Sequence, residues 1–229
     1  MIKAVVFDMY ETLITLFNSR VYKGRQIAAE MNISEEEFRK IWDPSEDART
    51  LGVITFEEVV AEILQKNGIF EKALYDSIIR NRYECSAEVF SHKHPDVVPM
   101  LEALKENGIK TGLITNCYLE EKDAIIKSDL YSLFDAVCMS CDVKMKKPDI
   151  KIFELCAEKL DVKTDECLYV GDGGSHELEA AHGAGMKPLQ ATWYLRSGVG
   201  QPCGRLDGFA HASAPMDVLK VVQGENNHS

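Results

Sequence analysis

Residues 2–13 read IKAVVFDMYETL, an almost unbroken apolar run that ends at Asp8. A run this short and this rich in β-branched residues, followed at once by polar ones, is typical of a strand buried on both faces. Such strands belong to parallel sheets covered by helices, whose ligands bind just beyond the carboxyl ends of the strands. Asp8 is therefore either a turn residue or a reactive group.

The composition is that of an ordinary globular protein, with 229 residues, 45% of them hydrophobic and 28% charged. This length suits one large domain, or a core with a smaller insert. The formal net charge of −11 disfavours nucleic acid as a partner, because gripping a phosphate backbone needs clustered Lys and Arg. No apolar stretch is long enough to cross a membrane. Seven cysteines, with no signal peptide pattern, predict free thiols in the reducing cytoplasm. The oligomeric state stays open.

A helical pattern follows the first strand and predicts a helical insert over residues 16–91. Ser34, with Glu37 three positions later, forms the pattern of a capping box. Thr55 has the position of an N-cap for a further helix. Between these helices, residues 43–52 are rich in turn formers. The expected helices of the insert are 21–31, 34–42, 55–67 and 71–83.

Short apolar strands then alternate with amphipathic helices, which predicts right-handed crossovers and a parallel sheet. A last strand is expected near Phe209 and a last helix over 215–222, with residues 224–229 frayed. The expected strands are 110–115, 136–140, 167–170 and 187–191, and the expected helices are 95–107, 119–129, 148–160 and 176–184.

Polar side chains follow two of these strands. Thr115 and Asn116 end one strand, where a hydroxyl and backbone amides can hold an anionic oxygen or simply begin a turn. Lys147 stands directly before Pro148, either on a solvated face or turned inward to supply a positive charge to an anion. Each signal is weak when taken alone.

The strand 167–170 ends in a glycine-rich loop that carries two carboxylates, Asp172 and Glu177. Glycines let a backbone turn sharply or approach a ligand closely. Acidic oxygens near a phosphate site are natural ligands of magnesium. The alternative is an ordinary loop in which Glu177 favours the first turn of a helix.

Taken together and in this order, the four stretches 5–13, 113–116, 147–153 and 169–186 make the chain resemble the haloacid dehalogenase superfamily of hydrolases. The resemblance implies an α/β fold with a Rossmann-like parallel-sheet core, formed by residues 1–15 and 92–229. It also implies a helical cap domain, inserted after the first motif over residues 16–91. The expected substrate is a small phosphorylated metabolite.

In the phosphatases of this family, the residue matching Asp8 is the nucleophile, and it forms an acyl phosphate that water later hydrolyses. The residues matching Thr115 and Lys147 hold the transferring phosphoryl group, with help from the backbone amide of Asn116. The resemblance thus implies that Asp8, Thr115 and Lys147 are catalytic.

The resemblance also implies a Mg²⁺ ion bound by Asp8, the backbone carbonyl of Tyr10, and Asp172. Glu177 matches a second acidic position that binds the ion directly or through water. Such an ion offsets the repulsion between an anionic nucleophile and an anionic substrate.

Tyr10 departs from the phosphatase pattern, which has a second aspartate at this position as general acid and base. A tyrosine there resembles the 2-haloacid dehalogenases, which displace halide through the same aspartate without a metal. Those enzymes have no acidic residue matching Asp172. An uncompensated Asp172 beside Asp8 would be costly, and a metal is the simplest remedy, so phosphatase activity is preferred. Dehalogenation and a non-catalytic role in binding a phosphorylated ligand or a partner protein stay open.

Two further features have alternative interpretations. Trp42, Arg49 and the turn at Gly52 resemble the specificity loop of the family's caps, so Arg49 is expected either to reach an anionic substrate or to form a surface ion pair. Cys138 and Cys141 form a CxxC pattern. We interpret them as structural cysteines, because strand side chains three apart point to opposite faces.

Overall fold

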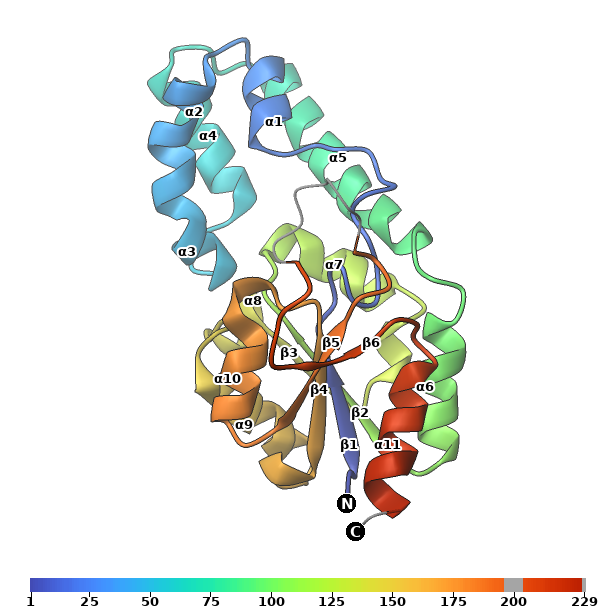
Figure 1. The fold of residues 1–229 in the computed structure, drawn as a ribbon. Helices are drawn as coiled ribbons and strands as arrows, with labels where there is room; N and C mark the ends of the chain where they lie inside the picture. The colour runs from blue at the N-terminus through green and yellow to red at the C-terminus, as the bar shows by residue number, and fades with distance from the viewer. Residues whose placement is uncertain (196–203, 228–229) are drawn as a thin grey trace.

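A computed structural model describes residues 1–195 and 204–227. Over these residues the chain forms a six-stranded parallel sheet in the order β3-β2-β1-β4-β5-β6 (Figure 1). The first strand therefore lies in the middle of the sheet, and the predicted α/β class with a Rossmann-like parallel sheet is confirmed. The strands are β1 (Ala4–Phe7), β2 (Lys110–Thr115), β3 (Ala136–Met139), β4 (Cys167–Gly171), β5 (Lys187–Ala191) and β6 (Ala210–Ala212).

Helices cover both faces of the sheet, as the apolar run of β1 requires. Val5 and Phe7 pack into one buried cluster with α6, α7 and α11, whereas Ala4 and Val6 pack into another with α9 and α10. All four side chains are fully buried. These helices are α6 (Val97–Glu106), α7 (Leu119–Lys127), α9 (Ile150–Lys159), α10 (Glu177–Gly183) and α11 (Asp217–Asn227).

Five helices precede α6 and lie beyond the carboxyl ends of the strands; we call them the cap (Figure 1). They enclose an apolar cluster of their own, separate from the two clusters of the sheet. The predicted capping box of Ser34 and Glu37 is confirmed, and Thr55 caps its helix as predicted. The cap helices are α1 (Gly24–Glu30), α2 (Glu35–Trp42), α3 (Glu46–Thr50), α4 (Phe56–Lys66) and α5 (Lys72–Glu88).

Most helix ends differ from the predicted ones by one to three residues, and four larger features of local structure were predicted wrongly. The stretch 43–52, expected to be turns, holds a 3-10 turn (Asp43–Ser45) and α3. The helix expected to end at residue 83 continues to Glu88 in α5. Ser140 does not end β3 but begins a short helix, α8 (Ser140–Val143). Of the tail expected to fray over residues 224–229, residues 224–227 are helical, and residues 228–229 lie outside the described residues.

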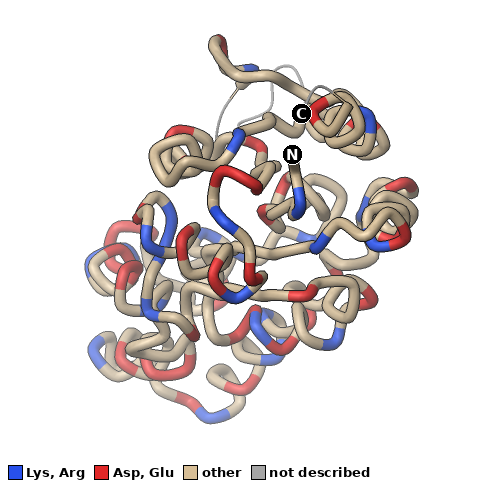
Figure 2. Tube along the Cα trace, turned by 90° about the horizontal axis from the view of Figure 1, so that it is seen from below, with Lys and Arg blue, Asp and Glu red and all other residues tan. Residues whose placement is uncertain are grey.

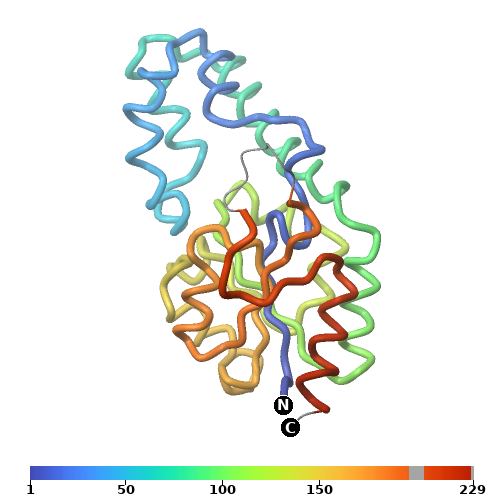
Figure 3. The backbone as a smooth tube through the Cα atoms, viewed as in Figure 1, coloured from blue at the N-terminus to red at the C-terminus, as the bar shows by residue number. Residues whose placement is uncertain are grey.

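Two passages of the chain connect the cap to the sheet, one after β1 and one between α5 and α6 (Figure 3). The cap also touches the core directly, since α5 lies against α7 and α3 lies against α8. Lys and Arg positions are interspersed with Asp and Glu along the chain (Figure 2). None of the described helices is both long and apolar enough to span a bilayer.

Candidate active site

The carboxyl ends of three neighbouring strands bring the predicted site residues together. Asp8 follows β1 and Thr115 ends β2, while Asp172 follows β4. Because β1 lies between β2 and β4, these three side chains meet at the middle of one sheet edge. All three are at least 94% buried, with exposed fractions of 6%, 0% and 4%.

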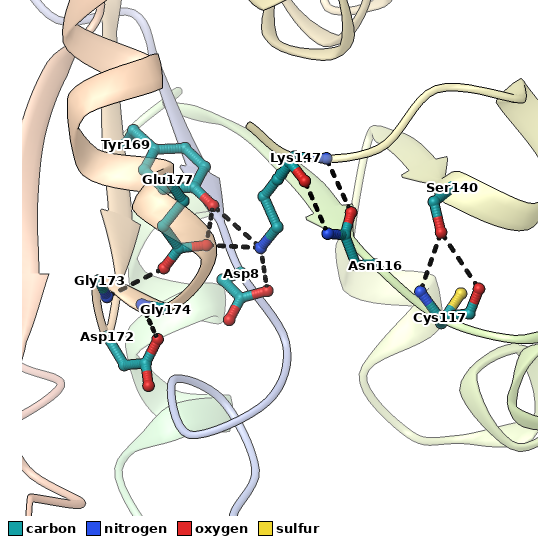
Figure 4. A network of polar contacts seen from close by, with 10 residues as sticks. All are labelled: Asp8, Asn116, Cys117, Ser140, Lys147, Tyr169, Asp172, Gly173, Gly174 and Glu177. Atoms are coloured by element: carbon teal, nitrogen blue, oxygen red, sulfur yellow. Dashed lines mark hydrogen bonds and ion pairs between the residues drawn. The ribbon is translucent and has the colours of Figure 1, made fainter. Parts of the chain in front are cut away.

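Lys147 lies between two carboxylates. Its Nζ atom is 2.5 Å from Oδ1 of Asp8 and 2.5 Å from Oε2 of Glu177 (Figure 4). The hydroxyl of Tyr169 donates to the same Glu177 oxygen at 2.8 Å and lies 3.3 Å from Nζ of Lys147. Lys147 is therefore turned inward and not on a solvated face.

The glycine-rich loop holds its two carboxylates through backbone amides. The amide of Gly174 donates to Oδ1 of Asp172 at 2.8 Å, and the amide of Gly173 donates to Oε1 of Glu177 at 3.1 Å. Gly173 has a φ of +96°, a conformation that side chains rarely adopt. Two backbone amides of the loop thus form hydrogen bonds to the loop's own acidic side chains.

Asn116 and Thr115 occupy different environments. The Asn116 side chain accepts from the backbone amide of Lys147 at 2.8 Å and donates to the Lys147 carbonyl at 3.0 Å. The Thr115 hydroxyl is buried and has no hydrogen-bond partner among the described residues. A buried polar group without a partner is costly, so the Thr115 hydroxyl is available to donate a hydrogen bond to a ligand or to accept one from it.

Burial and the nearby negative charges raise the pKa values of the acidic groups. Burial, with the carboxylate of Glu177, raises the pKa of Asp8 to about 8, although Lys147 acts in the opposite direction. Burial and Glu177 also raise the pKa of Asp172 to about 6. Burial raises the pKa of the Tyr10 phenol well above 10, so this side chain is neutral.

The acidic group fits a divalent cation. Asp8, Asp172 and Glu177 each offer an oxygen within 4.8 Å of the others, and all three are buried. Three carboxylates around one Lys147 ammonium leave an excess of negative charge, which a hard cation with oxygen ligands would neutralise. Because both oxygens of Glu177 already accept hydrogen bonds, Asp8 and Asp172 are better placed to bind an ion directly.

Two of the cavities at this end of the sheet are lined by Lys147. A cavity of about 130 Å³ lies directly at the acidic group and is lined by Asp8, Tyr10, Asp172 and Glu177, among others. A larger one, of about 650 Å³, lies between the cap and the core. The two cavities adjoin, since both are lined by Tyr10, Asn116, Lys147 and Ser175.

Arg49 lies away from the surface, and the interpretation as a surface ion pair is wrong. It is 1% exposed, and its Nε donates to Oγ of Ser45 at 2.9 Å. Its guanidinium lies 3.7 Å from the centroid of Trp42 and 4.8 Å from that of Tyr118. Trp42 and Tyr118 line the larger cavity, so Arg49 lies just behind its wall. A role in substrate binding stays a prediction.

Two residues of the site were missed. Tyr169 lies within β4, and the signal for it was a tyrosine in an otherwise apolar strand, whose hydroxyl needs a partner. Arg82 projects from α5 and pairs with Glu120 at 3.1 Å and with Glu121 at 2.7 Å on α7. It lines the larger cavity, but its partners lie far away along the chain, so no local pattern identifies it.

The CxxC cysteines lie on opposite sides of the sheet, as expected for structural residues. Cys138 belongs to one buried cluster and Cys141 to the other, and Cys141 lies in α8 and not on the strand. The Sγ atom of Cys141 is 3.7 Å from that of Cys117. The six described cysteines are free thiols; Cys203 lies outside the described residues.

Solved structures share this architecture. A 2-haloacid dehalogenase from Pseudomonas syringae superposes with a TM-score of 0.72 and 21% identity, covering 98% of this chain and all of the other. A HAD phosphatase from Thermococcus onnurineus superposes with a TM-score of 0.65 and 22% identity, covering 97% and 99%. At these identities the similarity concerns the fold alone.

Sequence comparison identifies the family. A protein named glyceraldehyde 3-phosphate phosphatase from Methanopyrus kandleri is 27% identical over 81% of this chain and 82% of its own. Another of that name, from Methanocaldococcus jannaschii, is 26% identical over 81% and 83%. The family model of haloacid dehalogenase-like hydrolases matches residues 2–185. The chain belongs to the haloacid dehalogenase-like hydrolases.

Proposed function

We propose that this chain is a magnesium-dependent phosphatase, which hydrolyses small phosphate monoesters through an aspartyl-phosphate at Asp8. The observation that carries the proposal is the buried group of Asp8, Asp172 and Glu177, with ligand oxygens within 4.8 Å of one another. Displacement of halide from carbon would need Asp8 and no cation. The other two carboxylates would then only make the ionised nucleophile less stable.

In the first step, a carboxylate oxygen of Asp8 attacks phosphorus, and the ester P–O bond breaks. In the second step, water attacks the same phosphorus, which releases inorganic phosphate and restores the Asp8 carboxylate. One difficult displacement becomes two easier ones. The bond between Asp8 and Lys147 keeps the nucleophile oriented.

Lys147 and Thr115 would hold the phosphoryl oxygens. The Lys147 ammonium is already within 2.5 Å of the nucleophile, and the Thr115 hydroxyl has no partner among the described residues. The side chain of Asn116, the residue after Thr115, bonds both the backbone amide and the backbone carbonyl of Lys147. These two bonds hold the Thr115 and Lys147 segments together. Donors fixed in advance around developing negative charge are usually the largest catalytic contribution.

Asp8 and Asp172, with the Tyr10 backbone carbonyl, would hold Mg²⁺, and Glu177 would act through water. The bound cation supplies electrostatic stabilisation of the phosphoryl oxygens. The Tyr10 side chain cannot act as a general base, because its raised pKa keeps the phenol protonated. A phenol with so high a pKa is also a poor acid at neutral pH, so the proton for the departing alcohol is expected to come from water.

The relatives named glyceraldehyde 3-phosphate phosphatase support a small phosphate ester as the substrate. The cavity of about 130 Å³ has room for a phosphoryl group, and the larger cavity would take the alcohol part. A location in the cytoplasm is proposed from the free, buried cysteines.

A panel of phosphorylated metabolites and p-nitrophenyl phosphate, assayed with magnesium and with EDTA, tests this proposal. Phosphate release should need both magnesium and Asp8, and the Asp8→Asn variant is the control. Tyr10 favours dehalogenation as the second candidate. Halide release from 2-haloacids in EDTA, with no phosphate release from any ester, would establish that candidate and refute the first. Binding of magnesium and phosphate without turnover would instead indicate a non-catalytic member.

A further inference from the structure

Two consecutive cap residues are joined to two consecutive core residues beside the candidate site, one pair directly and the other through the hydroxyl of Ser140. Arg49 and Thr50 end α3 of the cap. Cys117 and Tyr118 come directly after the pair Thr115–Asn116 in the core. The end of α3 is therefore connected to the segment that carries the Thr115 hydroxyl and the Asn116 amide, the candidate groups for binding the phosphoryl oxygens.

The first contact is a guanidinium held between two rings. Arg49 lies 3.7 Å from the centroid of Trp42, a cap residue, and 4.8 Å from that of Tyr118, a core residue. Arg49 donates to the Ser45 hydroxyl and to the Trp42 carbonyl; within residues 1–195 and 204–227, no carboxylate forms an ion pair with it, and its Nη1 atom has no hydrogen-bond partner. Aromatic faces attract cations, more strongly when water is excluded. The buried charge therefore binds cap to core through Tyr118.

The second contact is made by Ser140, the first residue of α8. Its Oγ accepts from the backbone amide of Cys117 at 3.0 Å (Figure 4). Its single hydrogen is shared between the carbonyl of Thr50 at 2.8 Å and that of Cys117 at 3.1 Å. Ser140 is fully buried, so water cannot replace these bonds. One hydroxyl thus joins the end of α3 to the segment after Asn116.

The turn after α3 leaves little freedom for this end of the cap. Gly52 has a φ of +60°, and a Cβ atom there would lie 2.3 Å from the carbonyl oxygen of Cys141. The Nζ atom of Lys144 donates to the carbonyls of Gly52 and Cys141, at 2.8 Å each. The cap turn is therefore in close backbone contact with α8.

We propose that Arg49 and Ser140 are positioning residues, which use the docked α3 of the cap to hold the segment Thr115–Tyr118 in place for catalysis. Neither side chain needs to touch the substrate. Small displacements of Thr115 or of the Asn116 amide would misplace the donors around the phosphoryl group, and errors of about 1 Å can cost roughly 100-fold in rate. The proposal goes beyond the phosphatase assignment, since it concerns how the cap and this segment are coupled.

Arg49→Met and Ser140→Ala are the test variants, and Asp47→Asn is the matched control. Asp47 also connects α3 to the core, through an exposed ion pair with Lys146, but it does not reach residues 115–118. Both test variants should lower kcat on the order of 10-fold with little change in KM, and Asp47→Asn should change neither. Arg49→Lys keeps the charge but not the planar group, so it should restore kcat only in part.

Hydrogen–deuterium exchange gives a second readout that needs no turnover. Arg49→Met should speed exchange of the Cys117 amide, although the substitution leaves its acceptor Ser140 untouched. If Arg49 only stabilised its local packing, the substitution would speed amide exchange in α3 alone. Unchanged exchange at Cys117, or an unchanged kcat in a destabilised Arg49→Met protein, would overturn the proposal. If the wild-type chain released no phosphate from any ester, the proposed function would fail, and exchange at Cys117 would still decide the coupling.

Discussion

The Nζ atom of Lys147 lies 2.5 Å from Glu177 and 2.5 Å from Asp8, so one buried ammonium holds the candidate nucleophile and the last acidic residue of the loop. The three side chains come from the end of β1, the loop before α9 and the start of α10. None is more than 6% exposed. The charge of Lys147 therefore serves both the stability of this edge of the sheet and the orientation of Asp8.

Lys147→Met should destabilise the protein and abolish activity. Removing one partner leaves buried charge uncompensated, which typically costs about 3–5 kcal/mol. Urea unfolding measures the loss. The double variant Lys147→Met/Glu177→Gln, which removes a charge of each sign, should recover part of the stability but none of the phosphatase activity. Equal stability of the two variants would show that the Lys147–Glu177 pair is not the source of the loss.

Tyr10→Asp should raise hydrolysis of alkyl phosphates far more than that of p-nitrophenyl phosphate. Nitrophenolate leaves without a proton, whereas an alkoxide needs one, and general acid–base catalysis is worth roughly 10²–10⁴-fold. The ratio of kcat/KM for the two esters measures the effect. Tyr10→Asn, which carries no acidic proton, is the control and should leave the ratio unchanged. An equal gain for both esters would exclude proton transfer as the cause.

Magnesium should stabilise the wild-type protein and fail to stabilise Asp172→Asn. A ligand bound only by the native state adds about 2.7 kcal/mol at a concentration of 100 times its Kd. Thermal unfolding with magnesium and with EDTA measures the shift without any substrate. A similar rise in Tm for both proteins would contradict the assignment of Asp172 as a ligand.

Without metal, the stability of the wild type relative to Asp8→Asn should fall as pH rises. Burial raises the pKa of Asp8 from 3.8 to about 8, so the folded protein holds this proton more tightly than the unfolded chain. The resulting stabilisation is complete below the unfolded pKa and is lost as pH rises to about 8. Urea unfolding in EDTA across that range measures it. Parallel pH profiles for the two proteins would exclude a raised pKa at Asp8.

The convergence of the candidate site could be predicted because it follows from topology. In a parallel sheet the carboxyl ends of all strands meet at one edge. A polar residue directly after each apolar run is therefore directed to the same place, which is why Asp8, Thr115 and Asp172 meet. The capping box at Ser34 could be predicted for a similar reason, since it depends only on residues three apart.

What the sequence did not reveal depends on contacts between distant segments. Arg82 is paired with Glu120 and Glu121, and only the docking of α5 on α7 brings them together. For Arg49 the sequence left both contact with an anionic substrate and a surface ion pair open, because its neighbours in sequence do not show what covers it. It is buried because Tyr118, far along the chain, covers it together with Trp42. Similarly, α3 was not predicted, because residues 43–52 are rich in turn formers; in the structure α3 packs against α8.

The most direct test of the central claim is mass spectrometry of the peptide that contains Asp8, quenched in acid during turnover with magnesium and an active ester. Attack by the carboxylate on phosphorus predicts a phosphoryl group on Asp8, present only while substrate remains and absent from Asp8→Asn. Phosphate release without this adduct, with Asp8→Asn still active, would contradict a covalent mechanism at Asp8.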